Sequence, residues 1–300
     1  MKQLIVNADG FGFTFGNNRA ILEVLEHGFI RSVSVNVTWS AVREVVSLMR
    51  HFPHVTVGVH FNLSVGPSIL PAAQIPSLVG GDGEFHGDAF HRLAFQRRLN
   101  VDEMKRELLA QVGVLHDLGV RITHWDSHQG RHLYPSFFEA AIEVGRHARI
   151  PASRSHKYHL VLPPGPRWSR WAAYYARHPR ALLSHRAAAW RTRLVRQAGI
   201  CVPDRRQVLH PLGEDAVHRG ECWRRMLETL PAGVNFIECH PGYVDDNLRR
   251  YSRVQESRER ERALFADSRW LARARDLGVE AVGYEVLSGV REASVADTCR

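Results

Sequence analysis

Short runs of β-branched and aromatic residues alternate along this chain with longer runs that have a helical period. The strand-like runs are expected at residues 4–8, 32–37, 55–60, 122–127, 235–239 and 280–284. The helix-like runs are expected at residues 17–27, 41–51, 102–118, 135–147, 215–230 and 253–277. Strand–helix repeats of this kind build a parallel sheet with right-handed crossovers. The pattern therefore predicts an α/β fold, a single TIM-like (β/α) barrel of about seven to eight strands that can be distorted.

We expect one domain over residues 1–300, because no compositional boundary divides the chain. Two segments interrupt the repeat. The turn-rich residues 80–85 predict a hairpin or loop tip. A basic helical excursion is expected at about residues 160–210, starting at Pro163-Pro164-Gly165-Pro166. Its helix would bury one face, formed by Leu183, Ala187, Trp190 and Leu194.

The stretch that contains the excursion accounts for the net positive charge of the chain. Between Pro151 and His210 there are twelve Lys and Arg residues and one acid, Asp204. A solvated arginine face over an aromatic contact with the barrel is the simplest interpretation. Peripheral contact with an anionic membrane is the second. Binding of nucleic acid is not expected, because no recognised nucleic-acid motif accompanies the arginines and aromatics.

The N-terminal segment and the cysteines indicate a cytoplasmic protein. No apolar run approaches the roughly 20 residues of a membrane-spanning helix. Residues 1–6 lead into a strand without the features of a signal peptide. The four cysteines form no C-x-x-C pair, which is typical of reduced thiols. We expect an unexported protein, peripheral to the inner membrane if the excursion contacts lipid.

Polar residues suited to chemistry stand where the predicted strands end. They are Asp9, His60, Asp126, His128 and His240. Parallel strands of a barrel bring their carboxyl ends to one face, so these residues would meet there. Two imidazoles and a carboxylate can bind Zn²⁺ or an oxygen-preferring divalent ion, and a second carboxylate can take a proton from water. The set is typical of metal-assisted hydrolysis of an amide or ester.

Each motif alone also has a structural interpretation. A single histidine at a strand end, such as His60, is more often structural than a ligand. The segment around Asp9 can be a plain strand-to-helix turn, and so can the segment after His240. The run from His124 to His128 is more specific, because strand alternation sends His124, Asp126 and His128 to one side.

Taken together and in order, four motifs resemble the YdjC-type carbohydrate deacetylases, which include the chitooligosaccharide deacetylases and a hopanoid-biosynthesis-associated branch. The motifs are Asn7-Ala8-Asp9-Gly10-Phe11-Gly12, Gly58-Val59-His60-Phe61-Asn62-Leu63, Thr123-His124-Trp125-Asp126-Ser127-His128-Gln129 and Glu238-Cys239-His240-Pro241-Gly242-Tyr243. The resemblance runs from residue 3 to about residue 287. The basic helix before Ala198-Gly199-Ile200 is most similar to the hopanoid branch.

The resemblance implies a metal-dependent hydrolase that removes N-acetyl groups from an amino sugar, either an N-acetylglucosamine oligosaccharide or a lipid-linked sugar. By position, His60 and His128 would bind the metal, Asp9 would be the general base and His240 the acid. The residues that would support the site or contact the sugar are Asn7, Asn62, Asp126, Arg131, His132 and Tyr243. The metal would be Mg²⁺ or Zn²⁺, since two imidazoles favour Zn²⁺ whereas the family is often described with Mg²⁺. A homodimer is also implied.

Two positions depart from the family pattern. The first motif of the family usually reads Asp-Asp-Phe-Gly, and its second acid is the expected carboxylate ligand of the metal; here that position is Gly10. The usual His-Gln-His-Val-His run reads His128-Gln129-Gly130-Arg131-His132, which would reshape the sugar pocket or favour an anionic substrate. The alternative hypothesis is therefore a non-catalytic sugar- or lipid-binding descendant with an impaired metal site.

Overall fold

The computed structural model of the chain describes residues 1–161, 172, 174–176, 179–209 and 216–287. Its centre is a nine-stranded sheet in the order β5-β4-β3-β2-β1-β8-β7-β6, with β9 paired to β1. All pairings between these strands are parallel. The strands are β1 (Lys2–Phe11), β2 (Ser32–Val35), β3 (Thr56–Phe61), β4 (Ile122–Ser127), β5 (Ala152–Ser153), β6 (Tyr158–Val161), β7 (Arg205–Leu209), β8 (Gly233–Cys239) and β9 (Val279–Val282).

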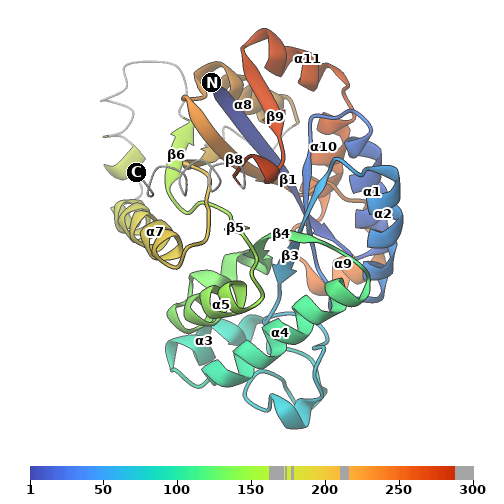
Figure 1. Cartoon of the computed structure of the whole chain (residues 1–300), viewed down its shortest axis with the longest axis vertical. Helices are drawn as coiled ribbons and strands as arrows, with labels where there is room; N and C mark the ends of the chain where they lie inside the picture. The colour runs from blue at the N-terminus through green and yellow to red at the C-terminus, as the bar shows by residue number, and fades with distance from the viewer. Residues whose placement is uncertain (162–171, 173, 177–178, 210–215, 288–300) are drawn as a thin grey trace, which may run out of the picture.

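The sheet curls into an open barrel, with its helices arranged around the outside (Figure 1). The two ends of the curl are β5 and β6, which are not paired with each other in the described part of the chain. The expected α/β TIM-like architecture is confirmed. The helices are α1 (Phe15–Leu25), η1 (Ser40–Glu44), α2 (Val45–His51), η2 (Ala72–Gln74), η3 (Gly87–Ala89), α3 (Phe90–Phe95), α4 (Val101–Asp117), η4 (His128–Leu133), α5 (Pro135–His147), α7 (Pro179–Gln197), α8 (Ala216–Thr229), α9 (Asp246–Tyr251), α10 (Glu256–Phe265) and α11 (Arg269–Asp276).

Strand β1 explains why functional side chains gather inside the curl. Leu4, Val6 and Ala8 belong to the main core, whereas Ile5 packs in a separate cluster that includes Phe236. Both faces of β1 are therefore buried, as expected for a parallel strand covered by helices. Strand alternation then places Asn7 and Asp9 on the same face as Ile5, near the carboxyl end of the strand.

Local sequence sets the ends of the helices as expected. The Asn100 side chain accepts hydrogen bonds from the backbone N–H groups of Asp102 and Glu103, which caps α4. The Thr14 hydroxyl accepts one from the Asn17 N–H and caps α1. The helix expected at 253–277 is instead two helices, α10 and α11. Between them, the Asp267 carboxylate accepts a hydrogen bond from the Arg269 N–H, a local side-chain-to-backbone contact at the start of α11.

The sequence pattern missed three strands, β5, β6 and β7. Strand β5 has two residues and β7 begins with two arginines, so neither shows a readable apolar period. The predicted hairpin at 80–85 is confirmed by antiparallel bridges from Val79 to Phe85 and from Pro67 to Glu84.

The basic excursion contains the expected helix, α7, but its predicted apolar face is wrong. Leu183 is 70% exposed and Trp190 is 59% exposed, whereas Ala188, Thr192 and Val195 are buried. The buried positions are thus one residue out of phase with the predicted ones, although Leu194 of the predicted face is partly buried against the core. The proline-rich start of the excursion, with Trp168 and Trp171, lies outside the described residues. Within the described helices, none combines the length and apolarity that crossing a membrane requires.

Candidate active site

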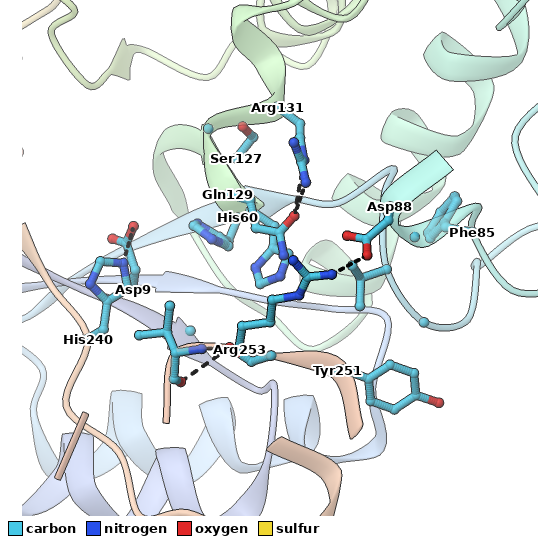
Figure 2. A pocket seen from close by; sticks show the side chains of 18 of the residues that line it. Asp9, His60, Phe85, Asp88, Ser127, Gln129, Arg131, His240, Tyr251 and Arg253 are labelled. Atoms are coloured by element: carbon cyan, nitrogen blue, oxygen red, sulfur yellow. Dashed lines mark hydrogen bonds and ion pairs between the residues drawn. The ribbon is translucent and has the colours of Figure 1, made fainter. Parts of the chain in front are cut away.

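A cavity of ≈ 780 Å³ opens at the carboxyl ends of β1, β3, β4 and β8 (Figure 2). Five of the residues predicted from the sequence line it, namely Asp9, His60, His128, Arg131 and His240. Figure 2 shows the His240 ring beside the Asp9 carboxylate, with His60 close to both. The chain thus brings residues more than 200 positions apart into one cavity, as the barrel topology predicts.

Asp126 holds the ring of His60 in place. Its Oδ1 accepts a hydrogen bond from His60 Nδ1 at 2.6 Å, and its Oδ2 accepts one from the Ser34 hydroxyl at 3.0 Å. Both side chains are buried. Burial alone would lower the pKa of His60, but the Asp126 carboxylate outweighs it and raises that pKa. Because Asp126 fixes the proton on Nδ1, the Nε2 atom of His60 is left to bind a cation.

The imidazole of His128 lies beside that of His60, with ring centroids 5.7 Å apart and planes 80° to each other. Its Nε2 is buried and, within the described residues, has no hydrogen-bond partner. Burial, reinforced by His60, lowers the pKa of His128 well below its ordinary value, so the ring is neutral. A buried, neutral imidazole with an unused nitrogen is suited to metal binding.

Asp9 lies between the Arg154 guanidinium and the partly exposed imidazole of His240. Its Oδ1 accepts a hydrogen bond from Asn7 Nδ2 at 2.6 Å, and its Oδ2 lies 3.7 Å from an Arg154 guanidinium nitrogen and 3.8 Å from His240 Nε2. Burial raises the pKa of Asp9 to about 6, and Asp126 adds to this, while His60 and Arg154 oppose it. A carboxylate with a pKa near 6 is suited to accept a proton at neutral pH.

His240 stands at the mouth of the cavity, with 38% of its side chain exposed. Its enclosure in the site, and next the charge of Arg258, lower the pKa of this imidazole well below its ordinary value. Since part of the ring reaches solvent, we expect the lowering to be smaller than for fully enclosed His128. The free site therefore holds His240 neutral at pH 7.

The residues present fit a divalent cation. Ligand atoms of Asp9, His60 and Asp126 lie within 4.8 Å of one another. Asp126 already holds His60 Nδ1, which leaves His60 Nε2 open. His128, with its unpaired Nε2, lies beside this group but is not part of it, and its expected role as a ligand stays a prediction. Asp9 can supply an oxygen, and Gly10 can supply none from a side chain.

Of the six residues expected to support the site or contact the sugar, Arg131 lines the cavity and five do not. Asn7 and Asp126 bond Asp9 and His60 of the site, whereas the other three bond elsewhere. Asn62 is buried and donates hydrogen bonds to Thr38 Oγ1 and the Val65 carbonyl, which holds the loop after β3. His132 is buried against Trp125 and hydrogen-bonds the Ser127 hydroxyl. Tyr243 donates to Glu23 on the outside of the barrel. These hydrogen bonds use polar groups of the three side chains within the fold, and the role expected for the residues, to support the site or contact the sugar, stays a prediction.

Sequence reasoning predicted Arg131 but missed three other arginines of the site. Arg154 is 4% exposed, and its guanidinium lies 3.7 Å from Asp9 and 3.9 Å from Asp126. Arg206 forms an ion pair with Glu238, and Arg258 also lines the cavity. Arg154 follows a strand too short to detect, and Arg258 lies in a run of charged residues that is typical of a solvated helix.

Gly10 occupies a bulge of β1, where the register with β2 shifts between Asp9 and Phe11. Its φ of +102° is one that residues with a Cβ atom rarely adopt. A carboxylate at this position would therefore carry a conformational cost that glycine avoids.

We expect Gly10→Asp to bind a divalent metal more tightly than the native chain and to unfold more easily. The added carboxylate would start beside Asn17 and Arg258, next to Asp9, and an oxygen turned toward Asp9 can join the site. The strained backbone costs about 1–3 kcal/mol. Metal titration and thermal unfolding of the metal-free protein measure the two effects. Gly10→Ala is the matched control, since it keeps the strain without the carboxylate. Unchanged metal affinity in Gly10→Asp would contradict the assignment of position 10.

Comparison with known proteins places this site in a family. A carbohydrate deacetylase from Thermoanaerobacter pseudethanolicus is 28% identical over 287 residues, which cover 96% of this chain and all of that protein. A chitooligosaccharide deacetylase from Enterobacter sp. (strain 638) is 38% identical over 170 residues, covering 55% of this chain and 66% of that protein.

A solved structure from Enterococcus faecalis V583, described in terms of cellobiose-phosphate cleavage, has the same fold. It superposes with a TM-score of 0.74 at 24% identity and covers 95% of this chain and 98% of its own. The family model described as YdjC-like protein matches residues 3–276, nearly the whole described barrel. The chain therefore belongs to the YdjC-like protein family.

Proposed function

We propose that this protein is a carbohydrate deacetylase that hydrolyses the N-acetyl group of an amino sugar. Relatives named carbohydrate or chitooligosaccharide deacetylase support this substrate class. The observation that carries the proposal is the Asp9–His60–Asp126 group beside the unpaired His128 nitrogen. Together these groups provide a base, a candidate metal site and a nearby imidazole in one cavity.

In the proposed reaction, His60 and His128 would hold the divalent cation, and Asp126 would keep the His60 ring in the required orientation. When bound, the cation supplies Lewis-acid polarisation of the amide carbonyl. Asp9 accepts a proton from the water that attacks the carbonyl carbon. The bond between that carbon and the amide nitrogen then breaks, which releases acetate and the amine.

The amine must gain a proton as it leaves, and His240 is the proposed donor. Because His240 is neutral at pH 7, it must first take up a proton. Asp9, protonated in the first step, lies 3.8 Å from His240 Nε2 and can supply it. One proton is taken from water and one is delivered to nitrogen, so Asp9 and His240 return to their starting states.

The direct test is acetate release from N-acetylglucosamine oligosaccharides. We expect release by the purified protein, its loss after EDTA treatment and its return on addition of Zn²⁺ or Mg²⁺. A coupled acetate assay measures the product, and the de-N-acetylated sugar is identified by mass spectrometry. A folded protein that releases no acetate with either metal would contradict the proposal.

Gly10 favours a second candidate function, a sugar-binding protein that has lost its metal. Elemental analysis distinguishes the two. A stoichiometric divalent metal that is lost on replacement of His60 supports the enzyme. Tight sugar binding by metal-free protein, without acetate release, supports the second candidate.

We also propose lipid-linked sugars, as in the hopanoid branch, as the finer substrate class, with α7 touching an anionic membrane. The exposed Leu183 and Trp190 on this basic helix support that contact. Co-sedimentation with anionic vesicles should weaken when Trp190 is replaced by alanine and when salt is raised.

A homodimer is proposed from the family resemblance alone and is measured by light scattering.

A further inference from the structure

The space beside Gly10 that a side chain would occupy, here named the hollow, is bordered by three buried hydrogen-bond donors that have no partner among the described residues. A Cβ atom at position 10 would lie 3.5 Å from Asn17 Nδ2, 3.6 Å from a terminal nitrogen of Arg258, Nη1, and 4.0 Å from Asn36 Nδ2. In the described part of the chain, none of these three nitrogens has a hydrogen-bond partner, and the Oδ1 atoms of the two asparagines, which do not border the added Cβ position, have none either. A fold seldom leaves three donors unpaired around one point, so the hollow calls for a ligand.

The three side chains are deeply enclosed. Asn17 and Asn36 are 0% exposed and Arg258 is 5% exposed. Water in bulk therefore cannot solvate the guanidinium, and its burial lowers the pKa of Arg258, which Glu261 and Asp9 only partly offset. Another part of the same guanidinium is fixed, because Nε donates to the Val254 carbonyl at 3.1 Å. Arg258 is thus held in place with Nη1 free.

The chemistry of the lining selects the ligand. One cationic and two neutral donors match an anion that offers several acceptor oxygens, and a guanidinium pairs best with a planar carboxylate. Gly10 and Arg258 both line the main cavity, whereas Asn17 and Asn36 lie behind its lining, so a ligand would reach the hollow from the substrate side along Gly10 and Arg258. A side chain at position 10 would enter this space, and glycine leaves it open.

We propose that the hollow beside Gly10 binds a carboxylate, held by Arg258 with Asn17 and Asn36. The carboxylate can come from a free acid, such as the acetate released by the reaction, or from an acidic group on the sugar itself. The first source depends on the proposed function, whereas the binding site does not. The site would make this chain either sensitive to its own product or selective for acidic amino sugars.

The test measures binding to EDTA-treated protein, so it needs neither metal nor turnover. Sodium acetate and sodium formate are titrated at constant ionic strength, with NMR line broadening of the ligand and the thermal midpoint of the protein as readouts. We expect saturable binding in the millimolar range. Arg258→Gln and Gly10→Ala should each weaken it about tenfold or more, since one removes a charged hydrogen bond and the other fills the hollow.

Arg253→Gln is the matched control. Arg253 also lines the cavity, but its guanidinium pairs with Asp88 at the exposed rim (Figure 2). Its replacement should leave acetate binding unchanged. Should either strained or buried variant fail to fold, Asn36→Ser tests the same site with a smaller change. Acetate affinity that is equal in all variants, or absent in the native protein, overturns the proposal.

A second titration separates the two sources. N-acetylmuramic acid, which carries a carboxylate, is compared with neutral N-acetylglucosamine. If the sugar supplies the carboxylate, acetate competes with the acidic sugar. Arg258→Gln then weakens binding of N-acetylmuramic acid but not binding of N-acetylglucosamine. If free acetate is the ligand, neither sugar displaces it. Failure of deacetylation with retained acetate binding would reject the proposed function and leave this site standing.

Discussion

Replacing Asp9 with asparagine is expected to lower the rate of acetate release on the order of 10³-fold and, at the same time, to stabilise the metal-free protein. The loss of rate follows from the loss of the general base. The gain in stability follows from the pKa of Asp9, which burial raises from an ordinary 3.8 to about 6. Keeping this carboxylate ionised at pH 7 costs about 3 kcal/mol, a cost that a neutral amide avoids.

The pH dependence of that gain is its internal control. Because the pKa of Asp9 is raised in the folded state, the free-energy cost of burying its charge disappears when the carboxylate takes up a proton. The stability difference between Asp9→Asn and the native chain should therefore be full above about pH 6 and vanish below about pH 4. Urea unfolding at several pH values in EDTA measures it. A variant less stable than the native chain at pH 7 would contradict the assigned environment of Asp9.

Replacing Asp126 with asparagine is expected to weaken divalent-metal affinity about 10–100-fold and to destabilise the protein by about 3 kcal/mol. Asp126 accepts hydrogen bonds from His60 and Ser34 and lies 3.9 Å from Arg154, all in a buried setting. An amide has one acceptor oxygen for these groups and no charge to offset Arg154. Metal affinity is measured by competition with a chromogenic chelator, and stability by urea unfolding.

The stability contributed by Asp126 depends on pH in the opposite direction to that of Asp9. Burial alone would raise the pKa of Asp126, but His60 and next Arg154 hold it below its ordinary value. Its stabilising contribution is therefore present above about pH 4 and is lost as the pH falls further. Asp88→Asn is the matched control, because its partner Arg253 is exposed and the pair should contribute little. Equal effects of the two changes would refute the role of Asp126.

The sequence was sufficient to predict the catalytic end of the barrel because strand ends carry a local signal. Asp9, His60, Asp126, His128 and His240 each follow or close a run of buried β-branched or aromatic residues, and all five surround the cavity or support it. Parallel topology alone then brings them together. The roles assigned to these residues stay predictions until the variants are measured.

The missing parts share a physical reason. Arg154 and Arg258 belong to the site because they are buried in it. Nothing in the local sequence distinguishes a buried arginine from the many exposed ones of this chain. The predicted face of α7 failed for a related reason, since large apolar residues indicate a buried face only where the barrel has room for them. Leu183 and Trp190 are exposed, while Ala188 packs inward.

The pairing of β1 has a consequence for how the chain folds while it is being synthesised. Residues 2–8 of this strand are hydrogen-bonded to β8, and residues 2–5 are also paired with β9, which begins at Val279. At ribosomal rates of about 5–20 residues per second, the first strand must wait for tens of seconds before its last neighbour is made. During that time its backbone is an unprotected edge, so nascent chains interrupted before residue 279 should depend on chaperones.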